Sequence, residues 1–104
     1  MEEYKIEISD TAERDLSDIL DYISIRLQEL IVAMNLLHRI QKEILSLHRM
    51  HERYRLVTDD YLAVRGFRML RVENYLVFYT VDQEHCVVNI VRVLYGKREW
   101  NVLL

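Results

Sequence analysis

Residues 67–95 read FRMLRVENYLVFYTVDQEHCVVNIVRVLY, and this stretch decides the fold. It holds three runs rich in Val, Ile, Tyr and Phe, at 67–73, 75–82 and 87–95. Only Asn74 separates the first two runs, and residues 83–86 separate the last two. Runs of this composition are typical of strands, and links this short join antiparallel neighbours. The stretch therefore predicts a three-stranded antiparallel meander.

The N-terminal third predicts a strand followed by a helix. Residues 4–9, YKIEIS, alternate apolar and polar side chains, as a half-buried strand does. Asp10 and Glu13, three residues apart, can form a capping box that starts a helix. Apolar residues then recur at helical spacing as far as Leu27, so the helix is expected to end there.

A second helix is predicted over residues 32–49, after a short connection at Gln28–Ile31. Its apolar stripe consists of Met34, Leu37, Ile40, Ile44 and Leu47. Two helices joined by so short a link lie antiparallel, as a helical hairpin. Residues 50–66 show no clean period and are expected to form a loop.

The predicted fold is therefore a single α+β domain spanning residues 1–104, with the element order β-α-α-β-β-β. The helical hairpin covers one face of a small, mostly antiparallel sheet. The first strand can rejoin this sheet beside the last one. The other face of the sheet is then left to bind a partner.

Composition excludes several classes of protein. Hydrophobic residues make up 51% and charged residues 30% of the 104 residues, which is typical of a soluble globular chain. The apolar runs are shorter than the roughly 20 residues of a membrane-spanning helix, so no membrane partner is expected. A single cysteine, Cys86, excludes an internal disulfide and favours the cytoplasm.

The sequence gives no sign of a cofactor or a metal. A glycine-rich phosphate loop is excluded, because the chain has only two glycines. His48 and His51 lie one helical turn apart, but no convincing third ligand accompanies them. We therefore predict neither a cofactor nor a metal site.

Charge is unevenly distributed along the chain. Residues 1–50 carry ten acidic and six basic side chains, whereas residues 51–104 carry seven acidic and eight basic ones. Either these charges are scattered and solvated, or an acidic side and a basic face meet one anionic partner in one orientation.

Three arginines in the predicted strands are candidate binding residues. Arg68 and Arg71 are expected on opposite faces of their strand, because side chains alternate. Arg92 is expected on the face of the last strand that also carries Val88, Ile90 and Leu94. These guanidinium groups suit phosphate or carboxylate recognition. For Arg92, an internal ion pair, for instance with Glu73 or Glu7, is an equally weighted alternative.

A basic and aromatic cluster follows the last strand, where Gly96 permits a sharp turn. Its members are Tyr95, Lys97, Arg98 and Trp100. Aromatic and cationic side chains together suit contacts with nucleic acid or a protein hot spot. Alternatively, Trp100 folds back onto the domain as a hydrophobic lid.

Three motifs in order resemble the RelE/ParE superfamily of bacterial type II toxin–antitoxin toxins. YKIEISDTAERDLSDILDYI is similar to the family's opening strand and helix, RMLRVENYLVFYTVD to its hairpin, and VVNIVRVLYGKREW to its last strand. The resemblance implies a growth-arresting toxin that is neutralised by a cognate antitoxin, with a heterotetramer as one form of that complex. It also implies a target, which is DNA gyrase for ParE-like members and the ribosome with its mRNA for RelE-like members.

The chain departs from the nuclease pattern of the RelE-like branch. Leu76 occupies the position of a nuclease arginine, Phe67 and Met69 fall near a lysine pair, and Leu104 falls on the C-terminal tyrosine. Arg98 keeps its place, and Tyr95 is a candidate acid or base.

We therefore favour a ParE-like toxin that acts by binding through the strand arginines and the tail. The alternative is a ribosome-dependent mRNA endonuclease that uses Arg71, Tyr95 and Arg98. A third reading is an inactive relative that only binds its antitoxin.

Overall fold

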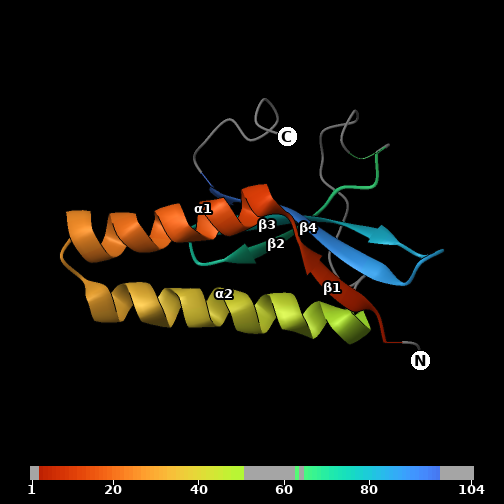
Figure 1. Cartoon of the computed structure of the whole chain (residues 1–104), viewed down its shortest axis with the longest axis horizontal. Helices are drawn as coiled ribbons and strands as arrows, with labels where there is room; N and C mark the ends of the chain where they lie inside the picture. The colour runs from red at the N-terminus through yellow and green to blue at the C-terminus, as the bar shows by residue number, and fades with distance from the viewer. Residues whose placement is uncertain (1–2, 51–62, 64, 97–104) are drawn as a thin grey trace.

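The computed structural model describes residues 3–50, 63 and 65–96. Its elements follow the predicted order (Figure 1), with a short π-helical segment at the end of the first helix. The elements are β1 (Lys5–Ile8), α1 (Asp10–Asp21), η1 (Tyr22–Arg26), α2 (Leu30–Met50), β2 (Arg68–Val72), β3 (Tyr75–Asp82) and β4 (Val87–Tyr95). Most of the predicted 50–66 loop, and the tail beyond Gly96, lie outside the described residues.

The four strands form one sheet in the order β1-β4-β3-β2. β2, β3 and β4 pair antiparallel, as predicted for the meander. β1 pairs parallel to β4, with Lys5 opposite Val87 and Ile8 opposite Ile90. A parallel neighbour requires a long crossover, and the helical hairpin supplies it. The predicted return of the first strand to the side of the last one is confirmed.

The start of α1 is capped by Ser9, and the predicted capping box of Asp10 and Glu13 is wrong. The Ser9 hydroxyl accepts the Ala12 amide hydrogen at 3.0 Å. The same hydroxyl donates to the Val91 carbonyl at 2.9 Å, and the Ser9 amide donates to the Ile90 carbonyl at 3.0 Å. One residue therefore ends β1, begins α1 and fixes both to β4.

The helical hairpin turns earlier than predicted. The first helix ends at Arg26, and α2 begins at Leu30, two residues before the expected start. Gln28 adopts a left-handed backbone conformation, with a φ of 53°, which ends a helix in the manner more common for glycine. In Figure 1 the two helices run antiparallel, and this end of the hairpin extends beyond the sheet.

The end of the hairpin exposes apolar side chains, because it has no sheet beneath it. Met34, predicted in the core stripe of α2, is 57% exposed, and Leu27 is 52% exposed. Ala33 and Leu36 are the buried residues of that part of α2. The neighbouring exposed apolar side chains are Ile25, Leu30, Ile31 and Val32.

Two apolar clusters lie on opposite faces of the sheet. The larger one joins the helices to side chains that include Leu70, Val77 and Tyr79. The smaller one, which we call the far-face cluster, consists of Phe67, Leu76, Phe78 and Leu94, with Ala63, Met69 and Val91 packed against it.

A β-bulge in β4 separates residues that sequence periodicity had grouped together. Ile90 pairs with Tyr79 in the helix-side cluster, whereas Arg92 pairs with Phe78 in the far-face cluster. The predicted common face of Val88, Ile90, Arg92 and Leu94 is therefore wrong. The extra residue in the bulge changes which side chains point to each face.

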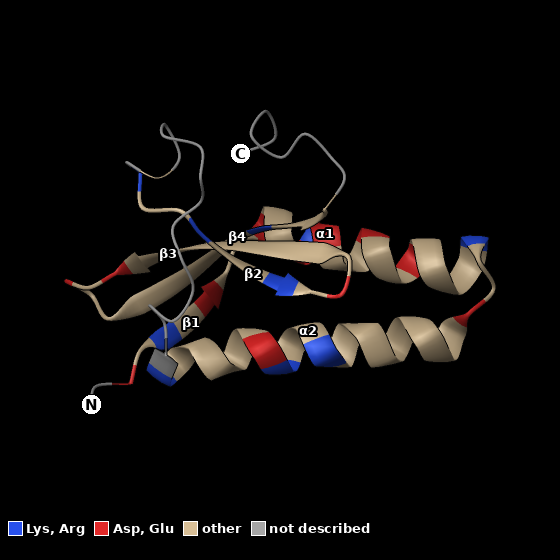
Figure 2. Ribbon diagram, turned by 180° about the vertical axis from the view of Figure 1, so that it is seen from behind, with Lys and Arg blue, Asp and Glu red and all other residues tan. Residues whose placement is uncertain are grey.

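Charged residues of the described part do not gather on one basic face. Figure 2 shows Lys and Arg on β2 and on both helices, and Asp and Glu on β1 and on both helices. For these residues, the scattered arrangement is the one observed.

Candidate functional site

The pairing of α1 with β4 frames a groove on the helix side of the sheet. The Arg92 guanidinium donates two hydrogen bonds to Asp15, from Nε to Oδ2 at 2.7 Å and from Nη2 to Oδ1 at 2.9 Å. The Val93 amide also donates to Oδ2 of Asp15, at 3.0 Å. β1 has ended by this point, so the carboxylate replaces a neighbouring strand at the edge of β4.

This ion pair is largely removed from water. The Arg92 side chain is 19% exposed and that of Asp15 is 11% exposed. Hydrogen bonding to Asp15 raises the pKa of Arg92 above its ordinary value, although partial burial opposes the rise. Of the two alternatives for Arg92, the internal ion pair is the one observed, and its partner is Asp15 in place of the suggested Glu73 or Glu7.

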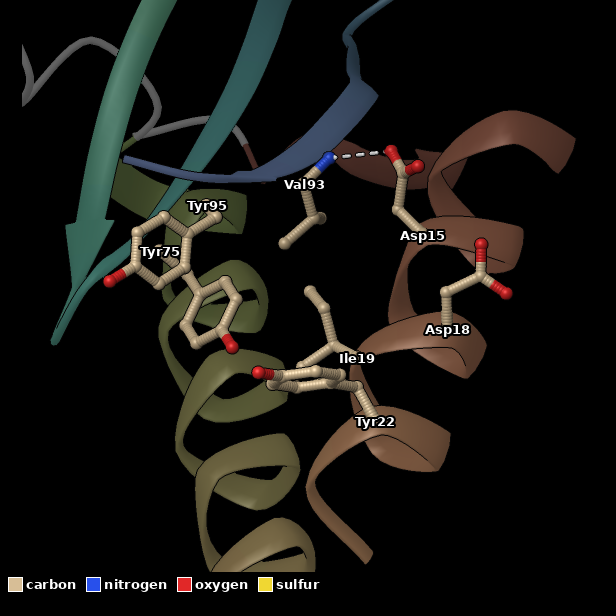
Figure 3. Close-up of a pocket in the computed structure, with 7 residues that line it drawn as sticks. All are labelled: Asp15, Asp18, Ile19, Tyr22, Tyr75, Val93 and Tyr95. Carbon is tan, nitrogen blue, oxygen red and sulfur yellow. Dashed lines mark hydrogen bonds between the residues drawn. The ribbon is translucent and has the colours of Figure 1, made fainter. Parts of the chain in front are cut away.

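A pocket of about 430 Å³ opens between α1 and the ends of β3 and β4. Its lining residues are Asp15, Asp18, Ile19, Tyr22, Tyr75, Val93 and Tyr95. Figure 3 shows Tyr22 pointing from the helix toward the Tyr75–Tyr95 pair, with Asp15 and Asp18 on the other side. The rings of Tyr75 and Tyr95 pack edge to face, with centroids 5.6 Å apart.

A second pocket of about 350 Å³ continues from the first toward the end of the hairpin. Both pockets share the three tyrosines Tyr22, Tyr75 and Tyr95. The remaining lining residues of the second pocket are Ile23, Leu27, Val32, Leu36, Glu73 and Asn74. We call the two pockets together the tyrosine groove, which has an acidic half and an apolar half.

Tyr75 is one of the three residues that line both halves of this groove. Burial raises the pKa of its phenol, and repulsion from Tyr95, Tyr22 and Glu73 raises it further. A neutral phenol offers an aromatic face and a hydrogen-bonding hydroxyl, but no strong charge. The groove is therefore better suited to binding than to acid–base chemistry at neutral pH.

The structure separates two of the predicted candidate residues. Arg71 pairs with Leu76, on the far face of the sheet, and its Nε donates to the Glu73 carbonyl at 2.9 Å. Tyr95 pairs with Tyr75, which packs against the helix-side core. Arg71 and Tyr95 therefore project to opposite faces.

Arg68 lies on the helix side of its strand, opposite Tyr79, so the predicted separation from Arg71 is confirmed. The tail candidates Lys97, Arg98 and Trp100 lie outside the described residues. Among the predicted residues that the structure describes, only Tyr95 lines the groove.

The far face of the sheet is apolar where the sequence departs from the nuclease pattern. Leu76 is 4% exposed and packs with Phe67 and Phe78. Met69 packs against the same cluster. The guanidinium of Arg65 lies over the Phe67 ring, 5.2 Å from its centroid.

Comparison with known families identifies the chain. Residues 6–100 match the family described as the ParE toxin of the type II toxin–antitoxin system parDE. The chain belongs to the ParE toxin family. The match begins within β1 and runs to residue 100, so it spans the helices and strands that the structure describes. No curated protein sequence is significantly similar to it.

Solved structures share the fold of this ParE-family toxin. A chain of the chromosomal ParDE toxin–antitoxin system of P. aeruginosa superposes with a TM-score of 0.75 at 17% identity, covering 90% of this chain and 97% of the other. A chain of the RelBE2 toxin–antitoxin complex of Mycobacterium tuberculosis gives 0.65 at 23% identity, covering 89% and 98%. At these identities the similarity establishes the α+β fold.

Sequence reasoning did not find the tyrosine groove of this toxin. One signal was present in α1 and the start of η1, where Asp15, Asp18, Ile19 and Tyr22 have the spacing of a single helical stripe. Acidic residues of an amphipathic helix are ordinarily expected on its solvated side. That stripe faces the ends of β3 and β4, which only the packing of the helix reveals.

Proposed function

We propose that this toxin arrests growth by binding a target of the gyrase type, without chemistry of its own. The main support for this proposal is the apolar packing of the far-face cluster. A nuclease must stabilise charge that develops on a scissile phosphate, which requires several converging donors or cations. Leu76, Phe67 and Met69, at or near the positions that resemble the nuclease cations, are packed in an apolar cluster instead.

The placement of Arg71 and Tyr95 supports the same proposal. A cation and a general base must reach one phosphate together, and these two residues occupy opposite faces of the sheet. Tyr95 faces a groove that is also lined by Asp18, whose carboxylate opposes the approach of a phosphate. An endonuclease would therefore depend on Arg98 and other residues of the tail.

The partner in this proposal is a cognate antitoxin that covers the toxin in the cytoplasm. Both similar structures come from toxin–antitoxin systems. The apolar side chains exposed at the end of the hairpin, among them Ile31 at 74% exposure, support a partner on this surface. A partly disordered, amphipathic antitoxin segment would bury more apolar area than this small domain can, and the complex would assemble as a heterotetramer.

The deciding experiment is pulse-labelling of DNA and protein synthesis after tightly controlled induction of the toxin in a bacterial host. We expect DNA synthesis to stop first, with broken DNA, while protein synthesis continues at early times. An immediate arrest of protein synthesis with normal DNA synthesis would support the endonuclease alternative. Unchanged growth and labelling would mean that the chain is an inactive relative.

Purified toxin provides a second test of the target. We expect it to inhibit supercoiling by DNA gyrase in a concentration-dependent way and to leave ribosome-bound mRNA uncut. Cleaved mRNA together with unaffected gyrase would contradict the proposal.

A further inference from the structure

The tyrosine groove combines two features that suit a cationic side chain. Three aromatic rings, from Tyr22, Tyr75 and Tyr95, line both of its halves. In the first pocket the carboxylates stand on the α1 side, where Asp15 and Asp18 lie one helical turn apart. Aromatic faces attract cations, and a nearby carboxylate adds a direct partner for the charge.

The two carboxylates differ in how much charge they offer. Asp15 is already neutralised by the guanidinium of Arg92. Among the residues that the structure describes, no Lys or Arg forms an ion pair with Asp18. Within the described residues the Asp18 carboxylate thus has no cationic partner, and it stands on the α1 side of the groove, across from the tyrosine rings.

We propose that this groove binds an arginine or lysine side chain of the antitoxin, held between the three tyrosine rings and the Asp18 carboxylate. The partner itself rests on the proposed function. The apolar half of the groove, lined by Ile23, Leu27, Val32 and Leu36, takes apolar side chains that neighbour the cation. The bound segment is thus amphipathic, with a basic anchor toward α1 and apolar residues toward the end of the hairpin.

Charge complementarity favours this occupant over an anionic one. An acidic side chain or a phosphate would meet Asp18 on one side and Glu73 on the other. Glu73 forms an exposed ion pair with Arg39 at 3.3 Å, so its charge is partly offset, whereas that of Asp18 is not. The basic residue would also fix the register of the antitoxin segment on the toxin.

The test uses full-length toxin made by cell-free synthesis and labelled on its tyrosine rings. The probe is a capped five-residue peptide with one arginine between leucines, and its neutral match has citrulline in place of arginine. Nuclear magnetic resonance titration follows the ring signals of Tyr22, Tyr75 and Tyr95. We expect all three to shift, with the arginine peptide binding about tenfold more tightly than the citrulline peptide.

Variants of the toxin identify the carboxylate that makes the arginine peptide bind more tightly than the citrulline peptide. Asp18→Asn is expected to remove most of the difference between the two peptides. Asp21→Asn is the matched control, because Asp21 also lies on α1 but is not among the residues that line the groove, and it should preserve the difference. Tyr22→Leu should weaken both the binding and the discrimination, since it removes one ring.

Three results would overturn the proposal. They are equal affinity for the two peptides, unmoved tyrosine signals, or a difference that survives in Asp18→Asn. The third result, combined with a large loss of thermal stability in free Asp18→Asn toxin, would show that Asp18 interacts with residues of the toxin itself.

The outcome is independent of the growth-arrest mechanism. Arginine-selective binding together with normal DNA and protein synthesis would leave the groove proposal standing while the proposed function fails. Gyrase inhibition without arginine-selective binding would support the proposed function and overturn the groove proposal.

Discussion

The carboxylate of Asp15 closes the edge of β4 in two ways, by accepting the Val93 amide hydrogen and by pairing with the Arg92 guanidinium. The carboxylate of Asp15 thereby joins the first helix to the last strand, and Asp15 and Arg92 lie 77 positions apart in the sequence. This contact also fixes the wall of the tyrosine groove, because Asp15 and Val93 both line it.

Replacing Asp15 is expected to destabilise the domain strongly. Asp15→Ala leaves the Arg92 guanidinium and the Val93 amide without their carboxylate, at a cost of about 2–3 kcal/mol in the free energy of unfolding. Urea denaturation should show a lower midpoint with an unchanged slope. Asp18→Ala, one turn further along α1, is the control and should stay within about 0.5 kcal/mol of the wild type. Similar losses in both variants would contradict a specific role for the Asp15–Arg92 pair.

The stability of the toxin should fall at alkaline pH in a way that depends on Tyr75. Its pKa in the folded state is raised above the ordinary 10.0, so the unfolded chain loses this proton first. The stabilising effect of the neutral phenol is complete below pH 10 and is lost as the pH rises through the raised value. Ultraviolet titration of tyrosinate should show a late-titrating group that is missing in Tyr75→Phe. If Tyr75→Phe instead removes a tyrosine that titrates at the ordinary pKa, the prediction of a raised pKa for Tyr75 is wrong.

Leu76 is expected to act through packing and not through target contact. Leu76→Ala removes buried apolar atoms from the far-face cluster and should cost about 2–4 kcal/mol in the free energy of unfolding. Leu45→Ala, at a residue that is 60% exposed, is the matched control and should have little effect. Toxicity of the Leu76 variant should decline only in proportion to the folded fraction. A stable but non-toxic Leu76→Ala protein would instead place the target on this face.

Arg98 is the tail residue whose loss should separate toxicity from folding. We expect Arg98→Ala to abolish growth arrest while the urea midpoint stays that of the wild type, because a tail cation contributes to a partner contact more than to the core. Arg14→Ala, on α1, is the control and should remain toxic. A folded, fully toxic Arg98→Ala protein would refute a role for the tail.

Local pattern was sufficient to predict most elements of the fold. The bounds of β3 and β4 agree with the sequence runs at 75–82 and 87–95, since apolar strand residues and turn residues are read over short windows. The ends of the hairpin were less accurate. The π-helical segment and the left-handed Gln28 depend on how the two helices meet, which no short window records.

By itself, the sequence determined the element order, the helical hairpin and a family resemblance, because each depends on side-chain periodicity along the chain. Tertiary structure decided the partner of Arg92, the face on which each strand residue lies after the β-bulge, and the tyrosine groove. The physical reason is distance along the chain. The groove forms where one stripe of the first helix packs beside strand ends that lie more than fifty residues away in the sequence. Burial of the core that the helices and the sheet share holds these segments together.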